Sequence, residues 1–257
     1  MELWIKALRA QIAQISNGRV VSVPSPLEEA PPEIALLSNE ISALGLAIAE
    51  RDRVQLALIH EVHHRVKNNL QIVSSLLNMQ ARKITDPSAR DALGRTQARI
   101  GALALIHRLL YEQNDKGEGS HIGIGRLITE LSAQLRVNYR GRTNIDLACE
   151  ASARGVPLDH AVPLALLSVE AITNAYAHAF PEGRKGRIDL RFCVTDDIGV
   201  LEISDDGVGF DPDGDSRSMG RPLMAAFAHQ LGGTLSVASA AGSGTVVSLR
   251  YPADANA

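Results

Sequence analysis

One short stretch holds the residue types in this chain that are best suited to chemistry. It contains His60-Glu61-x-x-His64, the spacing at which two histidines one helical turn apart bind zinc and the glutamate acts as general base. It also contains His64-Arg65-x-x-Asn68, in which a histidine nitrogen beside a cationic side chain is suited to accept a phosphoryl group. The sequence thus begins with two alternatives, a zinc hydrolase and a phosphotransfer site.

The zinc alternative needs a third protein ligand. In the longer pattern H-E-x-x-H-x-x-G-x-x-H, Leu70 stands where the third histidine belongs and Lys67 replaces the glycine. Asp86 and Asp91 remain conceivable ligands, but they fall near the far end of a predicted helical hairpin. A zinc hydrolase is therefore the minor alternative.

Helical geometry places His64 away from the apolar side of its helix. At about 100° per residue, it lies about 200° from Val62 and Val66, so we expect an exposed imidazole. Asn68 follows on the same face, where it is positioned to orient a water molecule. An exposed histidine is mostly neutral at cytoplasmic pH and so nucleophilic. We expect three further histidines to be structural or solvated: His60, His63 and His107, the last at the core or rim of a helical bundle.

Helical periodicity dominates the first 111 residues. A helix is expected before Asn17-Gly18, a proline-containing connector follows to Pro32, and a heptad-like stripe predicts one long helix over 33–83. A turn at 85–88 leads to a second helix marked by Leu93, Ile100, Leu103, Ile106 and Leu110. Two such hairpins from two protomers would form a dimeric four-helix bundle, although ordinary helix packing also explains the stripe.

After a polar linker at 114–120, short apolar runs alternate with amphipathic segments. This texture predicts an α+β domain. Strands are expected at 145–149, 188–194, 200–204, 235–238 and 246–251, and helices near 122–138, 160–179 and 222–231.

Composition excludes several classes of function. The 257 residues carry a formal charge of -3, so the chain has no basic excess for nucleic acid. Cys149 and Cys193 lie far apart, which indicates neither a disulfide framework nor a thiolate zinc site and suits a reducing cytoplasm. The longest uninterrupted apolar runs are shorter than about 18 residues, so we expect no transmembrane segment and a cytoplasmic location, or membrane association only through an upstream segment.

Polar and glycine residues of the second half are spaced as in a nucleotide site. Glu170 and Asn174 lie one helical turn apart, which lets a carboxylate and a carboxamide share one Mg²⁺. Asp205 follows a strand and is suited to accept the adenine amino group. Three glycines and a threonine accompany these residues: Gly207, Gly209, Gly220 and Thr245.

Together these residues resemble the GHKL (Bergerat) ATP-binding fold of gyrase, Hsp90, MutL and histidine kinases, an α+β sandwich, over about residues 120–253. In that resemblance Glu170 and Asn174 form the N box, which also includes His178. The segment 205–209 forms the G1 box, and 218–220 belongs to the glycine-rich lid. The resemblance implies ATP and Mg²⁺ as cofactors.

The helical hairpin resembles the dimerisation and phosphotransfer domain of HRxxN histidine kinases, relatives of the HWE group with a type 2 phosphoacceptor domain. The match lies in the segments 61–71 and 98–111. Residues 1–55 are more loosely similar to a HAMP signalling relay. The expected domains are therefore a HAMP-like relay at 1–55, a phosphotransfer hairpin at 56–117 and a catalytic ATP-binding domain at 118–257.

This resemblance implies a homodimer that autophosphorylates on His64 and exchanges the phosphoryl group with an aspartate of a response regulator. Arg65 and Asn68 would assist at the phosphoacceptor. Ala177 stands where the N box commonly has a phosphate-binding lysine, and Ser218 replaces the first lid glycine. A member that acts mainly as a phosphatase or phosphotransferase for its regulator therefore remains an alternative.

Overall fold

The computed structural model describes residues 2–16, 30–81, 83–114, 121–139, 144–211 and 220–253. The chain divides into two compact units, Met1–Arg65 and Val66–Ala257. The domain limits expected from the sequence stay a prediction, because this division follows contacts within the chain rather than function.

The first unit contains helix α1 (Glu2–Ser16) and the first part of helix α3 (Pro32–Ala81). Gln11 of α1 is fully buried, and its amide donates hydrogen bonds to the Ser38 carbonyl at 3.1 Å and to Ser42 Oγ at 2.8 Å. The single long helix predicted over 33–83 is confirmed. The connector at 17–29 lies outside the described residues, and the HAMP-like assignment stays a prediction.

A segment of α3 differs from the expectation that no stretch could span a membrane. Pro32–Gln55 is long and apolar enough by length and composition, with a mean hydropathy of 1.2. Charged residues interrupt the apolar runs of this segment, but they do not lower its mean hydropathy enough to rule out a span. Length and composition are weak grounds for a span, because an apolar helix of another kind meets the same two conditions.

The second unit is built on a five-stranded mixed sheet with the order β2-β4-β5-β7-β6. Neighbouring strands are antiparallel except for β2 and β4, which run parallel. The five strands are β2 (Ile145–Ala151), β4 (Gly186–Thr195), β5 (Ile198–Asp205), β6 (Thr234–Ser239) and β7 (Thr245–Pro252). All five match strands predicted from the sequence. A small pair that was not predicted joins β1 (His121–Gly123) to β3 (Gly155–Pro157).

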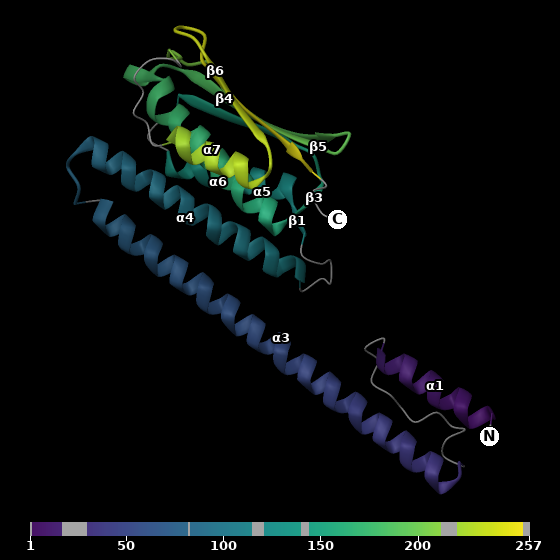
Figure 1. Ribbon diagram of the computed structural model, residues 1–257. Coiled ribbons are helices and arrows are strands. Elements are labelled where there is room, and N and C mark those ends of the chain that lie inside the picture. Colours follow the sequence, from purple (N-terminus) through teal and green to yellow (C-terminus); the bar gives the residue numbers. More distant parts are fainter. Residues whose placement is uncertain are drawn as a thin grey trace. The chain divides into compact units, whose positions relative to one another are not determined.

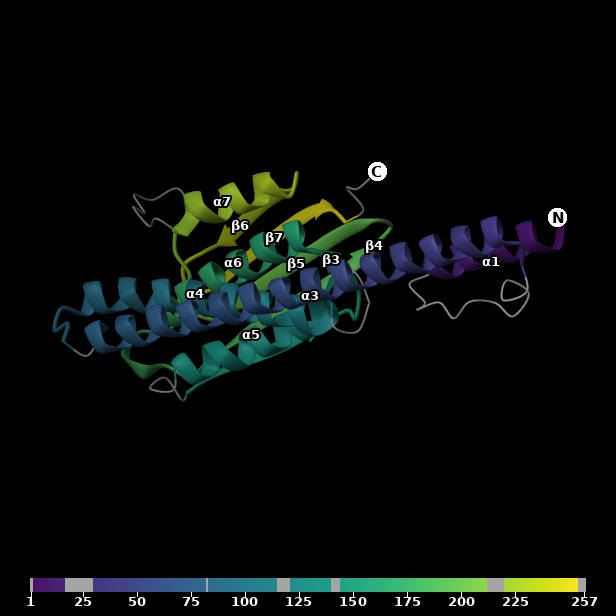
Figure 2. The ribbon, with the colours of Figure 1, turned by 90° about the horizontal axis from the view of Figure 1, so that it is seen from below.

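Three helices cover one face of this sheet, as Figures 1 and 2 show: α5 (Ile124–Asn138), α6 (Leu158–Asn174) and α7 (Gly220–Gln230). Helix α4 (Pro87–Asn114) packs on the outer side of α5 and α6. Asp86 caps the start of α4, where its carboxylate accepts a hydrogen bond from the Ala89 amide at 2.7 Å. The predicted α+β domain is confirmed.

The buried face of α4 differs from the stripe predicted for it. Ala98, Ala102, Leu105 and Leu109 are buried where α4 packs on α5 and α6, whereas Leu103 remains 37% exposed. Of the predicted stripe, Ile106 alone is buried to this degree. The prediction chose a stripe that omitted Leu105 and Leu109 as well as the two alanines, which permit a closer approach between helices.

Four salt bridges between α4 and α5, or within each helix, surround the C-terminal end of α4. Arg108 pairs with Glu130 at 2.6 Å and with Glu112 at 3.4 Å, while Arg126 pairs with Glu112 at 2.5 Å and with Glu130 at 2.8 Å. These arginines lower the pKa of Glu112 and, against the effect of partial burial, that of Glu130. The network fastens α4 to α5.

Large apolar side chains of α3 remain exposed within a single chain. Leu58 and Val62 are 62% and 58% exposed, and Ile72 is 57% exposed. On the side of α3 that the sequence predicts to be apolar, Val73 is also exposed, whereas Val66, Leu70 and Leu77 are half-buried. Within the described residues, that side is therefore only partly covered.

Candidate functional site

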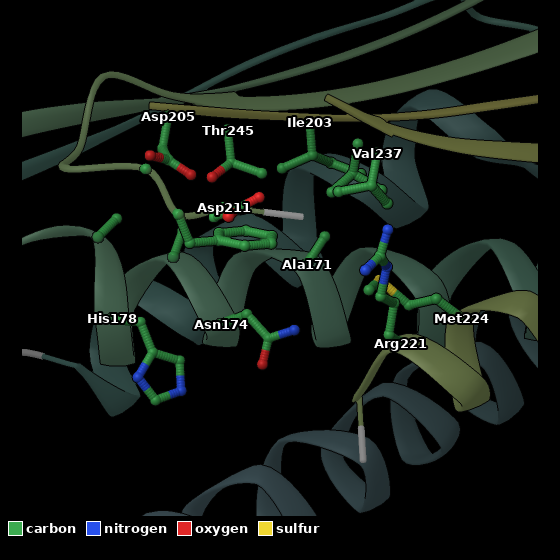
Figure 3. Close-up of a pocket in the computed structure, with 15 residues that line it drawn as sticks. Ala171, Asn174, His178, Ile203, Asp205, Asp211, Arg221, Met224, Val237 and Thr245 are labelled. Carbon is green, nitrogen blue, oxygen red and sulfur yellow. The ribbon is translucent and has the colours of Figure 1, made fainter. Parts of the chain in front are cut away.

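Helix α6 changes its winding at the first candidate residues. The α-helix ends at Asn174 and continues as a π-helical turn, Ala175–Ala179. Such turns add a residue to the helical circuit and are frequent at functional sites. Here the turn carries His178, and Figure 3 shows the side chains of Asn174 and His178 on the same side of the cavity.

The loop after β5 lies close to this turn. Val208 donates a backbone hydrogen bond to the Ala179 carbonyl at 2.9 Å. A Cβ atom on Gly207 would collide with Ala179, so only glycine permits this approach. Gly209 has a φ of +60°, the left-handed region that favours glycine.

These elements enclose a cavity of about 480 Å³, within the range of small-molecule sites. Five of the residues predicted for the site line it: Asn174, His178, Asp205, Gly209 and Thr245. Figure 3 shows residues from α6, β5, α7 and β6 around the same space. Arg221, a cation that the sequence offers in place of the lysine missing at Ala177, also lines the cavity. The other lining residues were not predicted for the site: Ala171, Ala175, Ala179, Ile203, Phe210, Asp211, Met224, Val237 and Val247.

Asp205 lies at the end of β5, beside Thr245 of β7 in the strand register. Burial raises the pKa of Asp205, while hydrogen bonds from the Gly207 amide, at 2.9 Å, and from Thr245 oppose that rise. Ser239 Oγ lies 3.1 Å from Thr245 Oγ1 and so helps to fix the threonine. The result is a partly buried carboxylate whose orientation is set by the backbone.

Gly220 adjoins the cavity at the start of α7. A Cβ atom on it would lie 2.8 Å from Asn174 Nδ2, so the glycine allows α7 to begin against the N-box carboxamide. The preceding lid residues, including Ser218, lie outside the described residues.

Glu170 does not line the cavity, although it lies one turn before Asn174. Its side chain is fully buried, and both carboxylate oxygens accept hydrogen bonds from Arg99 of α4. The Arg99 Nη2 to Glu170 Oε2 distance is 2.9 Å, and a second bond joins Nε to Oε1. This hydrogen bonding raises the pKa of the Arg99 guanidinium. No sequence pattern indicates this pair, because its members are 71 residues apart.

The backbone of the candidate phosphoacceptor segment is helical, as part of α3. The side chains of His60, His63, His64 and Lys67 lie outside the described residues, so the predicted exposure of His64 stays a prediction. Asn68 is exposed. Arg65 forms an exposed ion pair with Glu61 at 2.7 Å, of a kind that contributes little stability and opens readily.

A zinc site would bring several histidine, cysteine or acidic side chains together. No group of three or more histidine, cysteine, aspartate or glutamate residues comes together among the side chains that the structure describes. Asp86, a conceivable zinc ligand, instead caps α4. His107 is half-buried, as expected for the rim of a helical bundle.

Comparison with known proteins finds two families along the chain. Residues 61–139 match the HisKA_2 family, described as "Histidine kinase". Residues 159–255 match the family described as "Histidine kinase-, DNA gyrase B-, and HSP90-like ATPase". The chain belongs to the histidine kinase family. The first match covers the second half of α3, α4 and α5, and the second covers α6 and the strands β4 to β7, in the order that the sequence predicts.

The sensor histidine kinase PdtaS of Mycobacterium tuberculosis is 30% identical over 220 residues, which are 80% of this chain and 42% of that protein. Blue-light-activated histidine kinase 2 of Erythrobacter litoralis is 30% identical over 213 residues, 79% of this chain and 58% of that protein. The chain thus spans about half the length of these curated relatives.

A solved structure has a similar fold. It is the histidine kinase domain of the Erythrobacter litoralis EL346 blue-light activated histidine kinase, with a TM-score of 0.56 and 28% identity. The alignment covers 76% of this chain and 92% of that structure. The fold of the second unit therefore agrees with that of a histidine kinase domain.

Proposed function

We propose that this chain is an ATP-dependent protein-histidine kinase of a two-component system. It autophosphorylates on His64 and passes the phosphoryl group to an aspartate of a response regulator. The observation that carries the proposal is the cavity in which Asn174, His178, Asp205 and Thr245 meet, in a chain whose helical hairpin belongs to a phosphoacceptor family.

The proposed reaction is a phosphoryl transfer between nitrogen and oxygen. The unprotonated ring nitrogen of His64 attacks the γ-phosphorus of ATP, so that a P–N bond forms and the P–O bond to ADP breaks. The other ring nitrogen then gives its proton to solvent, which leaves a neutral phosphohistidine ring. Asp205 accepts the adenine amino group. Arg65, once it leaves Glu61, is suited to neutralise charge on the transferred phosphate.

Asn174 and Glu170 are the residues that would hold Mg²⁺. Carboxamide and carboxylate oxygens are suitable ligands for this cation, and the two side chains are one turn apart on α6. A bound Mg²⁺ would neutralise charge on the phosphates of the nucleotide. Because both oxygens of Glu170 accept hydrogen bonds from Arg99, ligation by this carboxylate requires that the pair open.

We further propose that the active form is a homodimer with the catalytic unit in the cytoplasm, where ATP is available. Exposed apolar side chains on α3, Leu58, Val62 and Ile72 among them, support dimerisation, because a second α3 would remove them from water. The proposed partner is the receiver domain of a response regulator.

The test is incubation of the purified chain with γ-labelled ATP and Mg²⁺. We expect acid-labile, base-stable labelling of the wild type and none of His64→Ala. Labelling that persists in His64→Ala would refute this phosphoacceptor. Glu61→Gln is a suitable control, because it lies one turn from Arg65 on the same helix and its loss frees that arginine without removing the nucleophile.

A second candidate function is dephosphorylation of the regulator with little kinase activity. Two observations favour it: Ala177 replaces the usual phosphate-binding lysine, and Glu170 is paired with Arg99. Little self-labelling, together with faster loss of phosphate from a phosphorylated regulator, would support it. Asn68→Ala should then slow that loss, and undiminished activity in this variant would exclude the water-orienting role of Asn68.

A further inference from the structure

The contact between Arg99 and Glu170 joins the phosphoacceptor hairpin to the nucleotide-binding helix. Glu170 has no exposed side-chain surface, while Arg99 retains 34%. Hydrogen bonds from Nε and Nη2 occupy both carboxylate oxygens. The pair is thus bidentate, which is the strongest arrangement that these two side chains form.

This pair occupies the oxygens that a divalent cation would use. In a buried site, a carboxylate whose lone pairs accept hydrogen bonds from a guanidinium cannot offer the same lone pairs to Mg²⁺. Binding of the metal at Glu170 therefore competes with Arg99. The apparent affinity for a metal-bound nucleotide is therefore the intrinsic affinity multiplied by the fraction of molecules in which the pair is open.

We propose that Arg99 is an autoinhibitory latch, which holds Glu170 until Mg²⁺ and nucleotide displace it. This proposal rests on the function proposed above, since it takes Glu170 as a metal ligand. The latch closes when α4 is seated on α5 and α6. Small residues make that seating close: Ala98 and Ala102 are buried, and a Cβ atom on Gly101 would displace the Gln134 side-chain amide of α5.

The neighbouring residues show how the latch couples to the hairpin. Near the hairpin turn, Gln97 Nε2 donates to Asn78 Oδ1 of α3 at 3.2 Å. Gln97 and Ala98 directly precede Arg99, so the same helical turn contacts α3 and carries the latch. A shift of α4 relative to α6 would separate Arg99 from Glu170 and free the metal site.

The test is calorimetric titration of the wild type and Arg99→Met with ADP, once with Mg²⁺ and once with EDTA. Methionine keeps the aliphatic length and removes the cation. We expect the ADP Kd in Mg²⁺ to fall about tenfold, the change that corresponds to the loss of one competing interaction of about 1.4 kcal/mol. The Kd in EDTA should not fall, because an unpaired Glu170 repels the phosphates. The ratio of the ADP Kd in EDTA to the ADP Kd in Mg²⁺ therefore rises about tenfold.

Arg95→Met is the matched control. Arg95 lies one turn earlier on α4, and no ion pair of it is found within the described part of the chain, so its loss removes the same charge without freeing Glu170. The ratio should stay at the wild-type value. Arg99→Lys keeps a cation but not the bidentate geometry. Its ratio of ADP Kd in EDTA to ADP Kd in Mg²⁺ should lie between those of the wild type and Arg99→Met.

Melting temperatures provide a second measurement, because an unpaired buried carboxylate destabilises the fold. Arg99→Met should melt below the wild type in EDTA and recover with Mg²⁺ and ADP. Adding Glu170→Gln to Arg99→Met should restore the melting temperature and abolish the Mg²⁺ dependence of ADP binding.

Two results would overturn the latch. A ratio that is unchanged in Arg99→Met, or that rises equally in Arg95→Met, overturns the latch and leaves the nucleotide site standing. If ADP binds to none of these proteins, the latch and the proposed ATP site are both overturned.

Discussion

Replacing Gly209 with alanine tests whether the cavity wall depends on close backbone approach. Gly209 has a φ of +60°, and a Cβ atom there would collide with the Ala240 carbonyl oxygen and lie 2.9 Å from the Gly244 oxygen. A left-handed alanine costs about 1 kcal/mol. Displacing backbone that has no free rotamer adds about 2 kcal/mol. We therefore expect a loss of about 3 kcal/mol in the free energy of unfolding, or about 9 °C in Tm.

Gly232→Ala separates the two contributions. Gly232 has nearly the same φ, +61°, but no atom lies within 4 Å of the added Cβ in the described structure. This variant should lose about 1 kcal/mol, or about 3 °C. Urea and thermal unfolding measure the difference, and ADP binding should weaken in Gly209→Ala but not in Gly232→Ala. Equal losses of stability in the two variants would refute the argument from close approach.

Two further predictions concern charged groups. Because burial raises the pKa of Asp205, ADP affinity should fall on acidification at a pH above the usual aspartate value of about 3.9, and Asp205→Asn should bind ADP weakly with little pH dependence. In the α4–α5 network, the folded-state pKa values of Glu112 and Glu130 are lowered. These carboxylates therefore stabilise the fold fully above the unfolded-state pKa of about 4.3. The stabilisation is lost as the pH falls through their folded-state pKa values. Urea unfolding between pH 7 and pH 3 should therefore show a shallower loss of stability in Arg126→Gln than in the wild type, and parallel curves would contradict this.

Local patterns carried enough information to predict the fold. The strand at Ile198–Asp205 alternates between buried and less buried residues, and the turn at Asp86-Pro87 combines an N-cap residue with a proline at the first helical position. Gly207 and Gly209 also predicted the site. A backbone position that has no room for a Cβ atom requires glycine, and glycine is visible in the sequence.

The rest of the site depends on tertiary contacts that sequence spacing does not carry. Met224 and Phe210 line the cavity because α7 and the loop after β5 fold over it. Arg99 reaches Glu170 only because α4 packs on α6, and nothing near position 99 distinguishes that arginine from Arg95. A charged residue at a helix edge is usually solvated, so its partner becomes known only from the fold.

The predicted apolar stripe of α4 differs from its buried face, and this difference allows the latch and a dimer to coexist. At about 100° per residue, Leu103 of the predicted stripe lies about 140° from Ala98 of the buried face. The two apolar surfaces therefore point in different directions, one toward α5 and α6 and the other toward what α4 would meet in a four-helix bundle. Arg99 lies between them, about 40° from Leu103. A rotation of α4 within a bundle would thus act on the Arg99–Glu170 pair directly, without any change in the helices of the ATP-binding domain.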